Sequence, residues 1–242
     1  MKAVMMVMSL VVLGGCASEG AAPWLALPGS SASCAKPDSS QELALSMADE
    51  MLGEGRPHAA LAHLEVLPAD LAQVRLRKAK VLRLLGRSEA EPLYRSLLGG
   101  CLAAEGEHGL GQLFAARGDN LQAQRHLLRA VRLAPTDEKV RNDLGVVYLS
   151  LGNVEQARFE FLTAIELKQN NTLAAVNLVS LMLYQDKWEQ AADLVSRLNL
   201  SPAQFNDAKR RAEQLKTPGK SAPSRADQVA AVSEPTPSFG QP

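Results

Sequence analysis

The chain has 242 residues, of which 46% are apolar and 4% aromatic, and its 26 Lys and Arg balance its 26 Asp and Glu. This apolar fraction is ample for a packed core, and abundant Ala and Leu without alternating β-branched runs favour an all-α fold. Because the formal net charge is zero, no overall field would draw the chain to nucleic acid, and we expect no nucleic-acid partner.

The N-terminus carries the sharpest local pattern. Lys2 precedes an apolar stretch from Ala3 to Leu13, and this stretch is followed by Gly14-Gly15-Cys16. The stretch is too short for a transmembrane helix, which needs about 20 residues to cross a hydrocarbon core of about 30 Å, and a buried core helix is the other alternative. The pattern resembles a lipoprotein signal peptide over residues 1–15.

This resemblance implies that Cys16 becomes the first residue of the mature chain and carries the lipid. Several acyl chains on Cys16 would hold the protein firmly on a bilayer, whereas a single chain holds only marginally. Ala17 follows Cys16, where an Asp would resemble a signal for retention in the inner membrane. We therefore expect a lipid-anchored protein on the periplasmic face of the outer membrane.

Two segments without apolar periodicity flank the centre of the chain. Residues 16–41 are rich in Ala, Ser, Gly and Pro, which is typical of a flexible tether, and residues 217–242 contain five prolines, which favours a disordered tail. Besides Cys16, the chain has Cys34 in the tether and Cys101. In a compartment where disulfides persist these two could form a bridge, and a buried free thiol at Cys101 is the ordinary alternative.

Residues 42–216 repeat themselves. The pairs Leu110-Gly111 and Leu144-Gly145 begin two segments that match at a spacing of about 34 residues, which is the length of a helical-pair repeat. The same spacing aligns Phe114 with Tyr148, Gly118 with Gly152, Ala123 with Ala157, Leu127 with Phe161 and Ala130 with Ala164. A third segment after them keeps most size classes, and two weaker segments precede them, one of which is a few residues shorter. We therefore expect about five units of two antiparallel helices each.

The repeated columns have a physical reason. Gly118 and Gly152 fit the turn between the two helices, where a left-handed backbone suits glycine, and Gly111 and Gly145 fit places where helices cross closely. The pattern resembles the tetratricopeptide repeat, which implies an all-α, right-handed superhelical solenoid. The stretch from Ala203 to Leu215 has a charged outer face and would be the capping helix that the end of a solenoid requires.

No pattern of residues indicates catalysis. The four histidines have no zinc-protease spacing and are interpreted as scattered surface or rim residues, there is no nucleophile elbow or phosphate-binding loop, and the cysteines are too few for a structural metal site. We therefore expect no enzyme, no cofactor and no metal.

The repeat register instead predicts a groove lined by the first helix of each unit, suited to a peptide or a helix of a partner. The side chains expected in it are Arg77, Lys80, Arg83, His108, Gln112, Asn142, Val146, Asn177, Ser180 and Tyr184. Its Arg77 end would be basic, and could bind an acidic peptide or be only a solvated face.

The region from Val140 to Gln204 is similar to TadD, the assembly lipoprotein family of the tight adherence (Flp) pilus. The resemblance implies a pilotin, whose lipid takes it to the outer membrane and whose groove helps the pilus secretin to assemble there. A type IV pilus pilotin and a periplasmic scaffold for envelope or peptidoglycan enzymes are the alternatives.

Overall fold

The computed structural model describes residues 34–217, which form eleven α-helices and no strand. Five of them are the first helices of pairs: α1 (Ser39–Gly53), α3 (Ala72–Leu84), α5 (Ala103–Ala116), α7 (Glu138–Ser150) and α9 (Thr172–Tyr184). Their partners are α2 (Pro57–Glu65), α4 (Ala90–Arg95), α6 (Asn120–Leu133), α8 (Val154–Leu167) and α10 (Trp188–Arg197), and α11 (Pro202–Lys216) closes the array. The predicted all-α solenoid of about five pairs with a C-terminal capping helix is confirmed.

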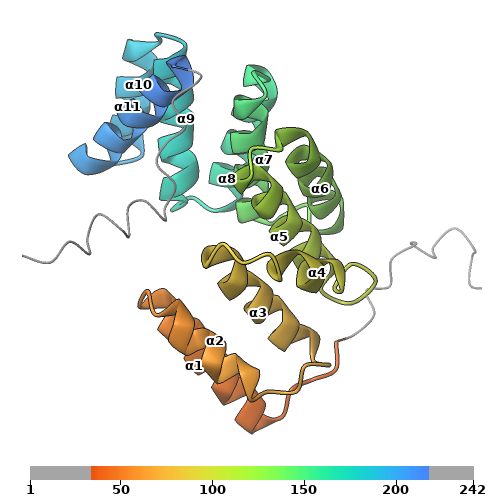
Figure 1. Ribbon diagram of the computed structural model, residues 1–242. Helices are drawn as coiled ribbons and strands as arrows, with labels where there is room; N and C mark the ends of the chain where they lie inside the picture. The colour runs from red at the N-terminus through yellow and green to blue at the C-terminus, as the bar shows by residue number, and fades with distance from the viewer. Residues whose placement is uncertain (1–33, 218–242) are drawn as a thin grey trace, which may run out of the picture. The chain divides into compact units, whose positions relative to one another are not determined.

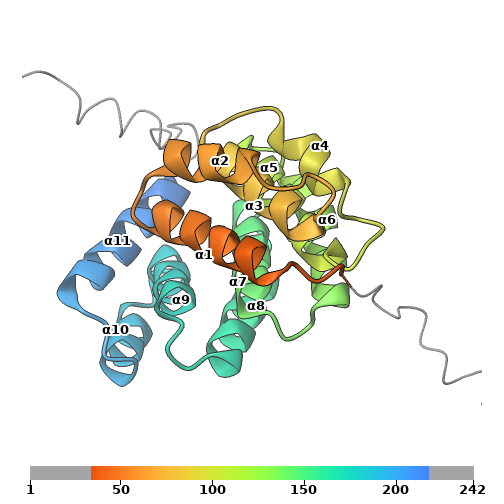
Figure 2. The ribbon, with the colours of Figure 1, turned by 90° about the horizontal axis from the view of Figure 1, so that it is seen from below.

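Helices that follow one another in sequence also pack together. Each first helix contacts its own partner helix and the first helix of the next pair, so the chain advances through Figure 1 in the order of its colours. The helices α9, α10 and α11 form one group in both Figure 1 and Figure 2. Because almost all contacts are between neighbours, the side chains on successive first helices come together along one surface.

The turn inside each pair has a residue with a left-handed backbone. Gly55, Gly86, Gly118 and Gly152 have φ between 69° and 79°. The same place in the fifth pair is taken by Asp186, with φ 59°. The predicted left-handed turns at Gly118 and Gly152 are thus confirmed, and Gly55 and Gly86 have the same conformation.

The other glycine column marks close contacts between helices. A Cβ atom added to Gly111 would lie 2.5 Å from the Leu127 side chain, and one added to Gly145 would lie 2.6 Å from the Phe161 ring. Both Leu127 and Phe161 are fully buried, so neither has room to move away. The expectation of close helix crossing at these glycines is confirmed.

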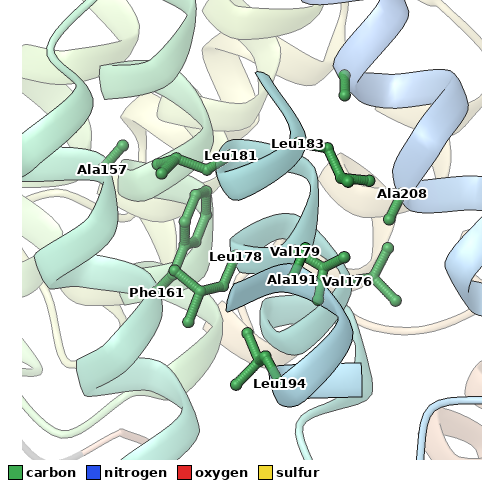
Figure 3. Packing of buried hydrophobic residues seen from close by; sticks show 11 residues of the cluster. Ala157, Phe161, Val176, Leu178, Val179, Leu181, Leu183, Ala191, Leu194 and Ala208 are labelled. Carbon is green, nitrogen blue, oxygen red and sulfur yellow. The ribbon is translucent and has the colours of Figure 1, made fainter. Parts of the chain in front are cut away.

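The most buried helix is α9. Nine of its residues, including every one from Ala174 to Leu181, are buried, because α7, α8, α10 and α11 all pack against it. Figure 3 shows Leu181 beside Ala157 of α8 and Leu183 facing Ala208 of α11. The capping helix therefore packs on α9 in the manner of a further first helix.

Both ends of the array are fixed by capping. Asp38 and Gln41 form a capping box, so α1 begins at Ser39, slightly before the predicted end of the tether at residue 41. Ser201 and Gln204 form another, with Pro202 in the first turn of α11. The predicted signal peptide 1–15, the lipidation site Cys16 and all of the predicted tail beyond Thr217 lie outside the described residues.

A disulfide joins Cys34 to Cys101, with the two Cα atoms 5.2 Å apart. It attaches the segment before α1 to the loop that precedes α5. Next to it, Gln73 Nε2 on α3 donates to the carbonyl oxygen of Ala35 at 3.0 Å. Within residues 34–217, no helix is both long enough and apolar enough to span a membrane.

Candidate binding groove

Three adjoining hollows lie along the first helices of the later pairs, and we call the surface they form the groove. The first is lined by Arg83, Gly111, Gln112, Ala115, Leu127, Asp143, Val146 and Val147. The second is lined by Val146, Leu149, Ser150, Phe161, Asn177, Ser180, Arg211, Gln214 and Leu215. The third is lined by Gln112, Glu138, Lys139, Asn142, Asp143, Lys168 and residues 170–173.

Shared residues make these hollows one surface. Val146 belongs to the first and second hollows, and Gln112 and Asp143 belong to the first and third. Val146 is 39% exposed and so offers apolar surface within the groove. Gly111 and Ala115 of α5 line the first hollow next to it. The groove can therefore accept apolar side chains next to polar ones.

Six of the ten side chains predicted for the groove line these hollows. They are Arg83, Gln112, Asn142, Val146, Asn177 and Ser180. The other four, Arg77, Lys80, His108 and Tyr184, lie on the same first helices outside the hollow linings.

The centre of the groove is organised by Asp143. Its Oδ2 atom lies 2.7 Å from His108 Nε2 and accepts a hydrogen bond from Gln112 Nε2 at 2.7 Å, while its Oδ1 accepts from Asn142 Nδ2 at 3.2 Å. Burial raises the pKa of Asp143, but the interactions with His108, Gln112 and Asn142 together outweigh it, so the pKa is lowered from 3.8. The carboxylate therefore stays ionised and joins α5 to α7.

The hydrogen bonds continue from α7 to the capping helix. Asn177 Nδ2 on α9 donates to Asn142 Oδ1 at 2.8 Å, and Arg211 Nη1 on α11 donates to Asn177 Oδ1 at 2.9 Å. Arg211 is held in turn by an ion pair with Asp207 at 2.9 Å. A continuous polar chain thus runs across α7, α9 and α11.

This chain changes the predicted end of the groove. Asn177 and Ser180 were expected to face an open groove, yet they are only 4% and 1% exposed. The physical reason is that α11 packs on α9 and gives Asn177 a partner inside the chain. At the α9 end of the groove, α11 contributes polar groups through Arg211.

The opposite end is less basic than the sequence suggests. Arg77 donates from Nε to Asp49 Oδ2 on α1 at 2.8 Å, and this ion pair cancels much of its charge. Arg83 has a long hydrogen bond, 3.4 Å, from Nε to the Tyr94 hydroxyl. Lys80 reaches the solvent.

One histidine was wrongly interpreted as a surface or rim residue. His126 is 4% exposed, its Nδ1 lies 2.6 Å from Glu107 Oε2, and its ring stacks on Phe114. Arg129 also pairs with Glu107, at 2.8 Å. The misinterpretation arose because the partner, Glu107, lies on the neighbouring helix, and a search for local motifs does not detect such a partner.

The next repeat has a related pair in which the acidic residue lies on the other helix. Arg141 occupies the repeat position of Glu107, and it pairs at 3.1 Å with Glu160, which occupies the repeat position of His126. The sequence therefore contains a signal for this contact, because the acidic residue moves from the first position to the second between the two repeats. These pairs join the two helices of a repeat and do not line the groove.

The repeat character is supported by comparison with known proteins. The family described as tetratricopeptide repeat matches residues 138–171. The TPR repeat-containing protein PA4299 of Pseudomonas aeruginosa is 42% identical over 225 residues, covering 90% of this chain and 88% of that protein.

Two solved structures have a similar fold. TTC0263, a thermophilic TPR protein of Thermus thermophilus, has a TM-score of 0.60 at 20% identity, covering 72% of this chain and 98% of its own. Pseudomonas aeruginosa pilF has a TM-score of 0.56 at 20% identity, covering 81% of this chain and 99% of its own. At this identity the likeness concerns the fold alone.

Proposed function

Because this chain belongs to the tetratricopeptide-repeat proteins, a family of protein-binding scaffolds, we propose that it is an outer-membrane assembly lipoprotein whose groove binds a segment of a pilus secretin. The secretin would be that of a tight adherence (Flp) pilus. Its role would be that of a pilotin. The lipid on Cys16 would anchor the protein to the outer membrane, and the groove would bind the secretin.

The continuity of the three hollows is the observation that carries the binding role. Gln112, Asp143 and Val146 connect them across α3, α5, α7 and α9. An extended peptide or a helix can contact several first helices at once on such a surface, whereas a small compact ligand would use one hollow. The exposed Val146 gives that segment an apolar contact at the junction.

The N-terminal sequence supports the membrane part of the proposal. Its short apolar stretch ends at Gly15-Cys16 and is followed by Ala17, a pattern that favours lipidation and the outer membrane. The tether to Cys34 would then leave the array next to α5, where the disulfide holds it.

Cell fractionation tests the anchor and the client together. Cells carrying the wild type, Cys16→Ser or Val146→Glu are fractionated, and the amount and location of secretin multimers are measured. We expect Cys16→Ser to mislocalise the multimers and Val146→Glu to reduce them, since a buried charge would disfavour the apolar contact. Val66→Glu is the matched control, because Val66 is 80% exposed and lies outside the groove.

Secretin multimers of normal amount and location in both variants would contradict the proposal. A type IV pilus secretin affected in place of the Flp secretin would favour the type IV pilotin. Loss of envelope enzymes from the membrane fraction with both secretins intact would favour a periplasmic scaffold.

A further inference from the structure

One side of α8 is exposed along most of the helix, and a hollow lies beside it. We call this side the outer face of α8, and its exposed residues are Glu155, Phe159, Leu162 and Glu166. Phe159 is 62% exposed and Leu162, one turn further along, is 39% exposed. The hollow has a volume of about 310 Å³ and is lined by Tyr148, Glu155, Gln156, Phe159 and Glu160. A hollow next to adjacent exposed apolar side chains is typical of an interaction surface.

The preceding repeat shows why this hollow is open. There, Phe114 occupies the repeat position of Tyr148, and the ring of His126 stacks on it with 5.2 Å between the ring centres. In the next repeat, the position of His126 is taken by Glu160, whose carboxylate pairs with Arg141 at 3.1 Å. Within residues 34–217, no aromatic ring stacks on Tyr148 and no cation lies over it. Tyr148 therefore lines an open hollow at the place where Phe114 is covered by a ring.

The lining of the hollow suits an arginine side chain. Two of its residues are aromatic and two are acidic. Glu160 is already paired with Arg141, whereas Glu155 has no ion pair in the part of the chain that the structure describes. A guanidinium group stacks on aromatic faces and also donates charge-assisted hydrogen bonds to a carboxylate, which a lysine ammonium does less well.

The helix α6 carries such an arginine on its corresponding face. Arg125 occupies the repeat position of Phe159, is exposed, and has no ion pair among the described residues. It does not line the hollow of its own chain. One turn before it, Leu121 is 63% exposed. The corresponding face of α6 therefore combines a cation with an apolar side chain.

The two helices are also complementary in charge. The helix α6 contains three arginines and no acidic residue, whereas α8 contains three glutamates and one arginine. Arg132 of α6 occupies the repeat position of Glu166 of α8, so a register that brings Arg125 to Phe159 also brings Arg132 to Glu166 when the helices are parallel. This complementarity indicates a second copy of the same chain as the occupant of the hollow.

We propose that two copies of this chain associate through α6 and α8, with Arg125 of each copy entering the hollow beside Phe159 of the other. Because positions one repeat apart lie side by side on the surface of a solenoid, both contacts form at once and the pair is closed by a twofold axis. This inference goes beyond the proposed binding role and does not depend on it, since the outer-face residues do not line the groove.

Sedimentation velocity of the full chain in detergent tests this inference. The Kd of self-association is measured for the wild type, Arg125→Ala and Phe159→Ala over a range of concentrations. We expect the wild type to form dimers, and each variant to raise the Kd by about tenfold because the contact between the cation, the ring and the carboxylate is lost. Arg158→Ala is the matched control, since Arg158 is exposed on α8 and does not line the hollow, and its Kd should equal that of the wild type.

A mixture of the two variants tests the pairing itself. In a mixed pair, Arg125 of the Phe159→Ala copy still meets the intact hollow of the Arg125→Ala copy, so one complete contact remains. With one variant labelled by a fluorophore, we expect the Kd of the mixed pair to be lower than the Kd of either variant alone.

Three results would overturn the inference. A wild type that stays monomeric at every concentration reached would leave the hollow to an arginine of another protein. Dimers with the same Kd in the wild type, Arg125→Ala and Phe159→Ala would show association through a different surface. A mixed pair whose Kd lies between those of the two variants alone would show that Arg125 and Phe159 do not meet.

Discussion

Gly145 and Gly152 are both needed in the fourth helical pair, for different physical reasons. A Cβ atom at Gly145 would overlap the Phe161 ring, 2.6 Å away, while Gly152 has open space around it but a φ of 76°. The first position excludes a side chain, and the second excludes a backbone conformation.

These reasons predict different responses to substitution. Gly145→Ala should lower the free energy of unfolding by about 1–3 kcal/mol through overpacking, and Gly152→Ala by about 1–2 kcal/mol through backbone strain. Gly152→Asn should recover part of the loss, since Asn tolerates the left-handed region. Urea unfolding measures all three.

Gly53→Ala is the control for these variants. Gly53 ends α1 and a Cβ atom there meets nothing within 4 Å, so the change should be neutral or slightly stabilising. Equal stability of Gly145→Ala and the wild type would show that Phe161 can move, and would contradict the close packing of its ring on Gly145.

The ionised state of Asp143 predicts a pH dependence. Its pKa is below 3.8 in the folded chain because the interactions with His108, Gln112 and Asn142 outweigh burial. A carboxyl whose pKa is lowered by folding stabilises the fold above its unfolded pKa and loses this contribution as the pH falls through the folded pKa.

Asp143→Asn should therefore be less stable than the wild type at neutral pH, and the difference should shrink below about pH 4. Urea unfolding of both proteins from neutral pH down through this range measures it. A difference that stays constant would mean that the Asp143 carboxylate does not carry the stabilisation.

At the scale of helices, α11 decides how much of α9 is accessible. Ala208 is fully buried and faces Leu183, and Arg211 binds Asn177. The small size of Ala208 is what allows the two helices to approach.

Ala208→Leu should weaken this contact and cost about 1–3 kcal/mol. Hydrogen exchange should show faster exchange of the α9 and α11 amides, with α5 and α7 unaffected. Ala203→Leu, at an exposed position of the same helix, should leave the exchange unchanged. Unaltered protection of α9 in Ala208→Leu would contradict the close packing of α11.

Features of a helix that are set locally and recur in each repeat could be predicted from the sequence. Gly118 and Gly152 could be placed in turns because the requirement is local and recurs with each repeat. Arg83 and Val146 could be placed in the groove for the same reason.

The partners of side chains could not be predicted this way. Asn177 is buried because Arg211 reaches it from α11, and His126 is buried because Glu107 lies across the helix pair. Such contacts depend on how neighbouring helices pack against one another. An alignment of the repeats, position by position, does not contain this information.

At the scale of the whole molecule, the disulfide between Cys34 and Cys101, with a sequence separation of 67, closes a loop around the first two helical pairs. Chain entropy predicts that it stabilises the fold by about 4 kcal/mol. The double variant Cys34→Ser with Cys101→Ser should lose about this amount in urea unfolding, and the wild type with a reductant should behave alike.

Each single serine variant is the internal control, because breaking either end opens the same loop. If the double variant unfolds at the same urea concentration as the oxidised wild type, the bridge does not constrain the unfolded chain.

The central claim is that the groove holds the secretin, and photocrosslinking in cells tests it most directly. A benzophenone amino acid is placed at Val146 in the groove or at Phe159, which is 62% exposed on α8 outside it, and adducts are identified by mass spectrometry. We predict a crosslink to the pilus secretin from position 146 and none from position 159. A secretin adduct from 159 alone, or no secretin adduct from 146, would contradict the account.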